Sequence, residues 1–359
     1  MTNSPRGARV AQRVAVIPGD GIGAEVTDAA LQVLDALRTR HGVEFEFTEL
    51  DWSCRRYAET GAMMPSDGLE TLRPHDAILL GAVGWPGVPD HVSLWGLLIP
   101  IRRTFRQFVN LRPVRTYAGV PCPLAGVGPD DVDLVVVREN NEGEYSEVGG
   151  RVYRGFAEEM AVQESVFTRA GVSRIADYAF ELASSRRGRL ISATKSNGIV
   201  HTMPFWDEVV ASRAAEFPGV SWRSEHIDAL AAKVVLAPGS MDVVLGSNLF
   251  GDILSDLTAA VAGSIGIAAS ANLDPTGQHP SMFEPVHGSA PDIAGEGKAN
   301  PVGMLASVAL MLQHLGHPEA AAELDAAITR SLADPATRTA DIDGTATTAD
   351  VTRFVAHAL

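Results

Sequence analysis

The chain has 359 residues, of which 46% are hydrophobic, and a formal net charge of −15 at pH 7. Because a single core stops growing at roughly 250–300 residues, this length predicts two domains. The acidic excess argues against nucleic acids and anionic membrane surfaces as partners, since both demand clustered Lys and Arg, and it favours a small-molecule partner.

Residues 1–12 are polar and basic and lack the apolar core of a signal peptide. No later run approaches the ~20 apolar residues of a membrane span. Cys54 and Cys122 stand in unrelated contexts and form neither a disulfide framework nor a Cys-x-x-Cys metal site. These features predict a protein of the reduced cytoplasm.

Apolar, β-rich runs alternate with helical patterns along the chain, which predicts an α/β architecture with a largely parallel sheet. Over residues 143–155, glycines interleave with Tyr145, Val148 and Tyr153, a pattern typical of hairpin strands that project from the body as a dimerisation arm. Strands are predicted at residues 14–17, 45–50, 77–81, 133–137, 189–193 and 243–247, and helices at residues 24–38 and 318–332.

The first strand runs into a glycine turn at residues 18–24, which fits the Gly-x-Gly-x-x-Ala fingerprint of dinucleotide-binding domains. Glu44 and Glu46 follow at about the distance of the acid that binds ribose in that motif. Taken alone, the motif predicts a Rossmann domain. It is a weak signal, because strand-to-helix turns of many α/β proteins need glycine for positive φ and close packing.

Arg102, Arg112 and Arg138 are candidate substrate ligands. Arginine presents a planar fork that grips a carboxylate through two parallel hydrogen bonds, so three converging arginines would hold a di- or tricarboxylate. Each of them alone is more often a surface salt-bridge partner. Tyr145 lies seven residues beyond Arg138, and Lys195 follows a predicted strand end, where ligands of open sheets bind. Lys195 can act as a base if burial or a nearby cation lowers its pKa from ~10.4 toward neutrality, a change of about 4 kcal/mol.

Asp252 and Asp256 lie four residues apart in a segment whose apolar residues recur at helical spacing, so both carboxylates share one helix face. Like charges at this spacing destabilise a helix by roughly 0.2–0.5 kcal/mol, which favours a cation between them. A hard divalent metal such as Mg²⁺ or Mn²⁺ suits two carboxylates plus water and substrate oxygens. The alternative is a solvated helix face, because Asp is common on surfaces.

Together, these motifs resemble the metal-dependent β-decarboxylating dehydrogenases, which comprise the isopropylmalate, isocitrate, homoisocitrate and tartrate/D-malate enzymes. The resemblance spans about residues 14–315 and rests on the segments at residues 19–23, 110–113, 248–256 and 283–295. It implies one large mixed sheet shared by two domains, unlike a Rossmann fold. The implied cofactor-binding domain contains both chain ends, residues 1–107 and 263–359. Residues 108–262 would form the dimerisation and substrate domain, with an arm at about 143–165.

The resemblance implies NAD as the cofactor, with the glycine turn on the nicotinamide side and the loop from residue 284 to residue 300 around adenosine. His287 would lie near adenine, and Asp292 would accept hydrogen bonds from the ribose hydroxyls and repel the 2′-phosphate of NADP. The implied cofactor-binding residues are Ile22, Glu284, His287, Gly288, Ser289, Ala290, Asp292 and Asn300.

The same resemblance implies a metal-assisted mechanism in a homodimer with shared active sites. Mg²⁺ or Mn²⁺, with room for a monovalent cation such as K⁺, would be held by Asp252 and Asp256 of one subunit and Asp228 of the other. Lys195, also donated across the dimer, would take the hydroxyl proton, and Tyr145 would protonate the enolate carbon. The three arginines would hold the departing carboxylate, and a monomer would be inactive.

Within the family, residues 81–102 resemble the tartrate/D-malate branch, especially Ser-Leu-Trp-Gly at residues 93–96. Trp95 and Leu98 predict a small substituent on the substrate C3, hydrogen or hydroxyl. The alternative for Trp95 is ordinary core packing. Pro100 departs from the family pattern and removes a backbone donor close to Arg102. 3-Isopropylmalate or a related 3-substituted malate therefore stays open as the substrate.

Overall fold

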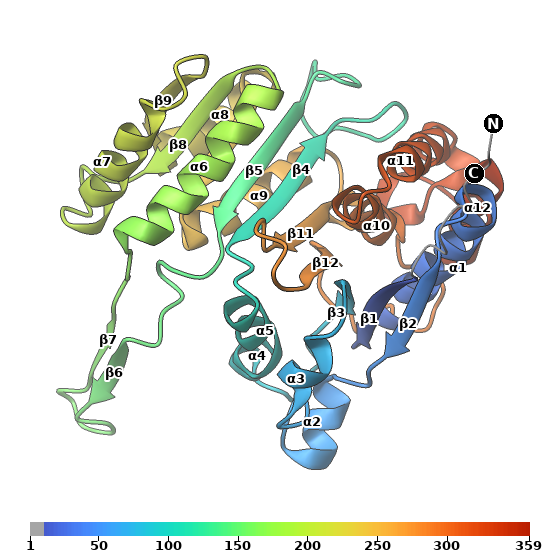
Figure 1. Cartoon of the computed structure of the whole chain (residues 1–359), viewed down its shortest axis with the longest axis horizontal. Coiled ribbons are helices and arrows are strands. Elements are labelled where there is room, and N and C mark those ends of the chain that lie inside the picture. The colour runs from blue at the N-terminus through green and yellow to red at the C-terminus, as the bar shows by residue number, and fades with distance from the viewer. Residues whose placement is uncertain (1–10) are drawn as a thin grey trace, which may run out of the picture. The chain divides into compact units, whose positions relative to one another are not determined.

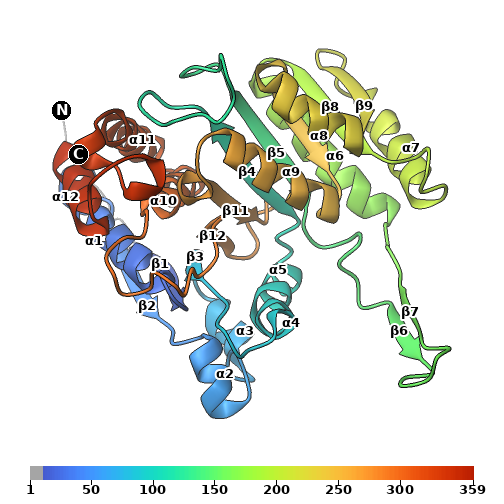
Figure 2. The same cartoon turned by 180° about the vertical axis from the view of Figure 1, so that it is seen from behind.

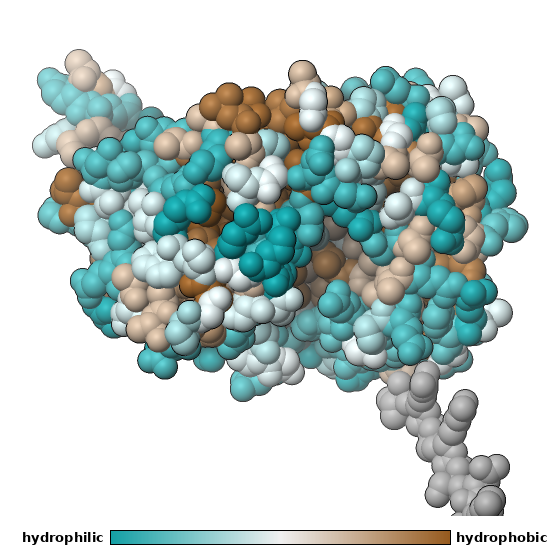
Figure 3. Space-filling view, turned by 90° about the horizontal axis from the view of Figure 1, so that it is seen from above, coloured by the Kyte–Doolittle hydropathy of each residue, from teal (hydrophilic) through white to brown (hydrophobic). Residues whose placement is uncertain are grey.

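The computed structural model describes residues 11–359, so most of the polar segment at residues 1–12 lies outside the described part of the chain. Figures 1 and 2 show strands and helices that alternate along most of the described chain, as in an α/β protein. None of the helices in the described residues is long and apolar enough to cross a membrane. The surface in Figure 3 is mostly hydrophilic, with hydrophobic side chains exposed in patches.

Ten strands of the described chain form one mixed sheet. In sheet order they are β2 (Phe45–Glu49), β1 (Gln12–Gly19), β3 (Ala77–Ala82), β12 (Ser281–Pro285), β11 (Ala269–Leu273), β4 (Val109–Arg115), β5 (Asp133–Glu139), β10 (Val243–Gly246), β8 (Arg189–Thr194) and β9 (Ser221–His226). The strand β4 pairs antiparallel with β11 and β5, whereas the neighbours β5, β10, β8 and β9 are parallel. The implied large mixed sheet is confirmed.

In chain order the helices are α1 (Gly23–His41), α2 (Cys54–Thr60), α3 (Gly68–Leu72), α4 (Asp90–Ser93), α5 (Ile99–Thr104), α6 (Arg169–Ser185), α7 (Thr202–Ala214), α8 (Ile227–Leu236), α9 (Asn248–Val261), α10 (Val302–His314), α11 (Pro318–Ala333) and α12 (Thr348–Ala358). A π-helical turn, η1 (Leu94–Leu98), connects α4 to α5.

The chain divides into two compact units. The first contains the described residues up to Ile101, together with Gly266–Ala269 and Thr276–Leu359. Its centre is the fully buried apolar run at residues 14–17 of β1, and α1 and α10 pack on its strands. The predicted domain limits, residues 1–107 with 263–359 and residues 108–262, assign functions to domains and stay a prediction.

The second unit contains Arg102–Ile265 and Ser270–Pro275. In it α6 and α7 cover one face of the parallel strands, and α8 and α9 cover the other (Figures 1 and 2). The strands β6 (Gly149–Val152) and β7 (Met160–Gln163) pair as a separate antiparallel hairpin that projects away from these helices. All eight residues of the two strands are exposed.

Candidate functional site

Four neighbouring parallel strands of the second unit bring the polar candidates to one edge of the sheet. Arg138 is the penultimate residue of β5, and α9 with its two aspartates begins directly after β10. Lys195 follows the last residue of β8, and Asp228 lies in the first turn of α8, just after β9. The carboxyl ends of parallel strands are where open α/β sheets bind ligands.

The register of β4 and β5 explains why two of the arginines meet. Arg112 of β4 pairs with Val136 of β5, two residues before Arg138, so the two arginines are diagonal neighbours on one face of the sheet. The helix α9 packs against β4 and β5. Both guanidinium groups are buried and contact side chains of that helix.

Asp252 and Asp256 lie one turn apart on α9 and contact arginines. Asp252 forms an ion pair with Arg138, and its Oδ1 lies 3.5 Å from Nη1 of Arg112. The same Arg112 nitrogen lies 3.2 Å from Oδ1 of Asp256. The two guanidinium groups therefore offset the repulsion between the carboxylates, and the pair is more than a solvated helix face.

Arg138 is held from several sides. Oδ1 of Asn248 accepts hydrogen bonds from its Nε at 3.1 Å and its Nη2 at 2.7 Å. A Cβ added to Gly251 would lie 2.5 Å from Cβ of Arg138, so the missing side chain allows α9 to approach β5. Burial lowers the pKa of Arg138 to about 10, Asp252 opposes this, and the charges of Arg112 and Arg102 add to it. The three predicted arginines are therefore electrostatic neighbours.

Tyr145 belongs to the same cluster. Its hydroxyl donates to Oδ2 of Asp252 at 2.9 Å. Burial is the largest cause that raises the pKa of Tyr145, followed by the charge of Asp252 and the hydrogen bond to it. The phenol therefore keeps its proton at neutral pH, which an acid catalyst requires.

Lys195 and Asp228 form a separate pair, with Nζ and Oδ1 2.7 Å apart. The hydrogen bond from Lys195 is the main cause that lowers the pKa of Asp228. Over residues 11–359, no three His, Cys, Asp or Glu side chains gather closely enough to hold a metal ion. Within one chain, Asp228 therefore does not complete a three-carboxylate set with Asp252 and Asp256.

The donor chemistry of α9 fits a hard divalent cation. Asp252 and Asp256 present carboxylate oxygens on adjacent turns, the ligand type that Mg²⁺ and Mn²⁺ prefer. Their side chains are 32% and 57% exposed, so solvent and a bound substrate can reach them. Two carboxylates alone leave most of an octahedral shell to other oxygens.

Trp95 and Leu98 lie in the π-helical turn η1, seven and four residues before Arg102 of α5. The backbone N–H of Ile99 donates to the carbonyl of Leu94, five residues earlier. Pro100 has no N–H to give to the next turn, which accounts for the wider turn directly before it. Both candidate specificity residues are partly exposed, so neither is fully enclosed in a core.

The loop at residues 284–300 contains a buried histidine suited to a nucleotide base. The ring of His287 is 9% exposed, its Nδ1 lies 2.9 Å from the carbonyl of Gly288, and burial lowers its pKa. Its Nε2 is buried without a hydrogen-bond partner among the described residues, so a ligand can supply one. Asp292 is exposed, and Ala290 adopts φ +37°, which strains a non-glycine residue.

Asn300, another predicted cofactor ligand, makes contacts inside the protein. Its Nδ2 lies 3.0 Å from Oδ2 of Asp341, and its Oδ1 accepts from the N–H of Val302 at the start of α10. Glu284 uses its carbonyl to accept from Ser307. These bonds fix the two ends of the loop.

The glycine turn is built differently from a Rossmann phosphate loop. The N–H of Ile22 donates to the carbonyl of Ser289 at 2.8 Å, and the N–H of Gly23 donates to that of Asp20. The Asp20 carboxylate, 7% exposed, accepts from the N–H groups of Cys54 and Gly84. A pyrophosphate would meet a buried carboxylate and amides that are already bonded, so the Rossmann alternative does not fit this turn.

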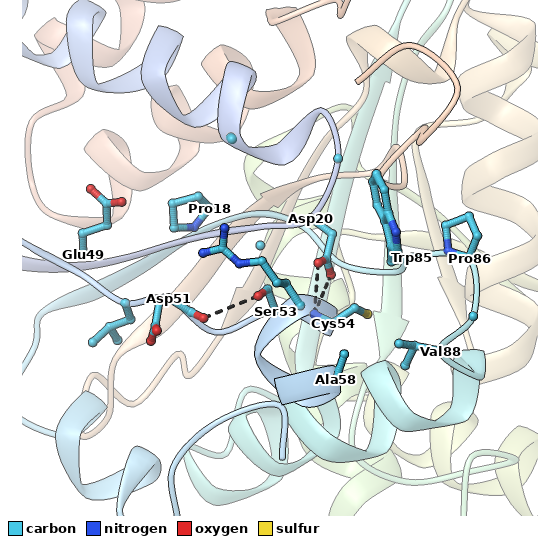
Figure 4. A pocket seen from close by; sticks show the side chains of 16 residues that line it. Pro18, Asp20, Glu49, Asp51, Ser53, Cys54, Ala58, Trp85, Pro86 and Val88 are labelled. Carbon is cyan, nitrogen blue, oxygen red and sulfur yellow. Dashed lines mark hydrogen bonds between the residues drawn. The ribbon is translucent and has the colours of Figure 1, made fainter. Parts of the chain in front are cut away.

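A cavity of about 680 Å³ lies beside the glycine turn (Figure 4). The ends of β1 and β2, the start of α2 and the loop after β3 line it, and Asp20, Cys54 and Trp85 are among its residues. Burial raises the pKa of the Cys54 thiol to about 12, so it is not a nucleophile at neutral pH. In the first unit, the glycine turn therefore lies between this cavity and Ser289 of the predicted adenosine loop.

Sequence reasoning missed several residues that complete the arginine cluster. Ser255 accepts from Nη1 of Arg112, and Asn248 holds Arg138. Asn248 and Ser255 belong to the same motif as the aspartates, but their roles depend on which strand α9 packs against. Glu144 was also missed, although it stands next to Tyr145.

Comparisons with known proteins agree with this geometry. A family model described as isocitrate/isopropylmalate dehydrogenase matches residues 13–355. The chain is 54% identical over 341 residues to the probable tartrate dehydrogenase/decarboxylase of Bacillus subtilis, which covers 94% of this chain and 95% of that protein. It is 54% identical over 347 residues to the D-malate dehydrogenase [decarboxylating] of Escherichia coli, covering 94% and 96%.

Among solved structures, the isocitrate dehydrogenase from Methylococcus capsulatus aligns with a TM-score of 0.87 and 30% identity, over 97% of this chain and 99% of that one. The implied fold and the suspected family are thus both confirmed. The chain belongs to the isocitrate/isopropylmalate dehydrogenase family.

Proposed function

We propose that this chain catalyses the NAD-dependent oxidative decarboxylation of a small (R)-2-hydroxy dicarboxylate, D-malate to pyruvate and CO₂, tartrate, or both. The observation that carries the proposal is a cluster of arginine, tyrosine and carboxylate side chains. The arginines of β4 and β5 contact the two aspartates of α9, and the hydroxyl of Tyr145 donates to one of them. The names of relatives at 54% identity support D-malate and tartrate as substrates.

Arg102, Arg112 and Arg138 bind the carboxylate that leaves. Arg112 and Arg138 are positioned by β4 and β5, and their contacts with the aspartates of α9 keep both guanidiniums oriented before substrate arrives. Orientation before binding saves the entropy of ordering long side chains.

Asp252 and Asp256 of one chain, with Asp228 of its partner, would hold Mg²⁺ or Mn²⁺. When bound, that cation acidifies the substrate C2 hydroxyl and polarises the ketone that oxidation produces. The carboxylate oxygens fit this role, and the exposure of Asp256 leaves room for substrate. A monovalent cation such as K⁺ is also proposed as a cofactor, from the family resemblance alone.

Lys195 and Tyr145 move the two protons. Lys195 accepts the proton of the C2 hydroxyl, directly or through water, and NAD, when bound, would supply the acceptor for the C2 hydride. The bond to the departing carboxylate then breaks, CO₂ leaves, and its electron pair stays on C3 as an enolate. Tyr145, whose raised pKa keeps it protonated, donates its proton to that carbon.

NAD is proposed to bind along the first unit. The buried Nε2 of His287 supports adenine binding in the loop at residues 284–300, and the cavity beside the glycine turn supports the nicotinamide side. Asp292 would accept from the ribose hydroxyls, and its negative charge disfavours a 2′-phosphate. The other proposed contacts are Ile22, Glu284, Gly288, Ser289, Ala290 and Asn300.

A homodimer with shared sites is proposed from the family resemblance, and the pairing of Asp228 with Lys195, separate from the aspartates of α9, supports it. The projecting hairpin supports a partner of the same kind, since it exposes large apolar side chains such as Tyr153, 64% exposed, and Phe156, 70% exposed. Exposed apolar side chains gathered on one hairpin favour association.

The competing proposal is a 3-isopropylmalate or other 3-substituted malate dehydrogenase. Trp95 and Leu98 favour a small C3 substituent, because a bulky indole near the substrate leaves little room for an isopropyl group. Pro100, whose ring fixes its φ angle, lies in α5 two residues after Leu98.

NAD reduction measured side by side with Mn²⁺ on D-malate, L-tartrate, 3-isopropylmalate and isocitrate tests this. We expect the largest kcat/KM on D-malate or tartrate and loss of turnover in EDTA. A preference for isopropylmalate above about tenfold, or ~1.4 kcal/mol, would overturn the substrate assignment. Turnover that EDTA leaves unchanged would overturn the metal-assisted mechanism.

A further inference from the structure

Glu144 fastens the segment after β5 to the start of α9. Its Oε1 accepts from the hydroxyl of Ser247 at 2.8 Å, and its Oε2 accepts from the backbone N–H of Leu249 at 3.0 Å. The two partners lie about a hundred residues further along the chain, so this is a tertiary contact. The Nδ2 of Asn248 adds a weaker bond, at 3.3 Å, to the carbonyl of Glu142.

The carboxylate of Glu144 lies at the N-terminus of α9, where a negative charge stabilises a helix. The first turn of α9 has no acidic residue of its own, and Ser247 is its N-cap and is fully buried. Unbonded N–H groups and the helix dipole make a helix start favourable for an anion. Glu144 therefore supplies from another segment the charge that the sequence of α9 lacks.

This contact fixes the distance between two parts of the proposed site. Tyr145 is the next residue after Glu144, and its hydroxyl donates to Asp252 on the second turn of α9. The backbone of Tyr145 is thus anchored through Glu144 at the start of α9, while its hydroxyl is anchored one turn later. Arg103 adds a bond to the Tyr145 carbonyl at 2.9 Å.

We propose that Glu144 is a positioning residue that holds Tyr145 against the carboxylates of α9 in the orientation needed for proton delivery. The inference rests on the proposed function for the role of Tyr145. Glu144 itself touches neither substrate nor cofactor in this proposal, and it acts through Tyr145.

The variant Glu144→Gln tests it with little change in shape. Glutamine keeps one acceptor oxygen and replaces the other by an amide group that cannot accept, so the negative charge at the helix start and one of the two bonds to Ser247 and Leu249 are lost in their present form. Because small displacements of a reacting group are costly, we expect kcat to fall about tenfold or more while KM for the dicarboxylate changes less than about threefold. Glu181→Gln is the control, because this acid of α6 is exposed and belongs to none of the contacts described for Tyr145. It should behave as wild type.

A double-mutant cycle with Tyr145→Phe separates positioning from a general structural role. If Glu144 acts through Tyr145, Glu144→Gln should change kcat by less than about twofold once the phenol is gone. Full additivity of the two losses in kcat, or a Glu144→Gln enzyme whose kcat matches that of Glu181→Gln, would overturn the proposal.

Thermal unfolding gives a readout that does not depend on activity. Glu144→Gln should lower the Tm in the wild-type background, and by clearly less in a Ser247→Ala background, because the shared hydrogen bond is then already absent. An equal decrease in Tm in both backgrounds would show that Glu144 and Ser247 do not interact. If the contact is found but no dicarboxylate is turned over by the wild-type chain, the proposed function fails instead.

Discussion

At the scale of single residues, the most unusual group outside the proposed chemistry is Glu139, the last residue of β5. Its side chain is 1% exposed and follows Arg138 directly. Its Oε1 accepts from the N–H groups of Asn141 and Glu142, and Arg174 lies 3.6 Å away. Burial nevertheless dominates and raises the pKa of Glu139 from 4.5 to about 7.

This carboxyl should make the folding free energy depend on pH. Between pH 4.5 and about 7 the folded state holds a proton that the unfolded chain has released, so rising pH removes stability, by at most about 3 kcal/mol at 1.36 kcal/mol per pH unit. Glu139→Gln should therefore weaken the pH dependence of the free energy of unfolding, measured in urea. The variant should exceed the wild type in this free energy most clearly above pH 7. Glu147 is exposed, so Glu147→Gln serves as the control. Plots of unfolding free energy against pH that run parallel for the two variants would contradict this prediction.

The residues of the arginine cluster differ in how far sequence reveals them. Arg112, Arg138 and the two aspartates could be predicted from charge and spacing, because guanidinium and carboxylate groups carry their chemistry wherever they stand. Asn248 could not, since a short amide at a helix start is usually only a cap. Its role depends on Arg138 from a distant strand.

At the scale of elements, α9 approaches β5 at Gly251. Alanine there would favour the helix by about 1 kcal/mol through propensity alone. The added Cβ, however, would lie 2.7 Å from Cγ and 3.0 Å from Cα of Arg138, closer than real contacts allow. Packing therefore opposes propensity at this position, and overpacking of this kind costs about 1–3 kcal/mol.

Gly251→Ala should move Arg138 and weaken substrate binding. We expect a lower Tm and a KM for the dicarboxylate raised about tenfold, or ~1.4 kcal/mol, with a smaller effect on kcat. Gly219→Ala is the control, because a Cβ there meets nothing within 4 Å. A Gly251→Ala enzyme with unchanged KM would mean that α9 can shift without carrying Arg138 along.

The elements with simple patterns were predicted well, and their ends differ by no more than three residues. The strand β4 was missed because Pro113 interrupts its pattern, and proline is rare within sheets. In the structure Pro113 pairs with Val135 in an antiparallel ladder whose donor it cannot supply. The missed strand is the one that carries Arg112, so the convergence of the arginines could not follow from local patterns.

At the scale of the whole molecule, the proposed site is divided between two groups of side chains. Asp252 lies with Arg112 and Arg138, whereas Lys195 contacts Asp228. The family resemblance implied that these groups meet across a dimer. Sequence patterns alone could not show this, because they carry no information on which chain supplies a residue.

Mixed dimers provide the decisive measurement. Lys195→Ala and Asp252→Asn should each abolish activity as homodimers. When the two variants are coexpressed with different tags, a shared site makes one of the two sites in each heterodimer wild type and the other doubly defective. Random pairing makes half of all dimers mixed, so the pool should recover about a quarter of wild-type kcat, and purified heterodimers about half. If both residues instead serve a site within one chain, every site keeps one defect and no activity returns. Coexpression of two Lys195→Ala chains with different tags controls for the tags.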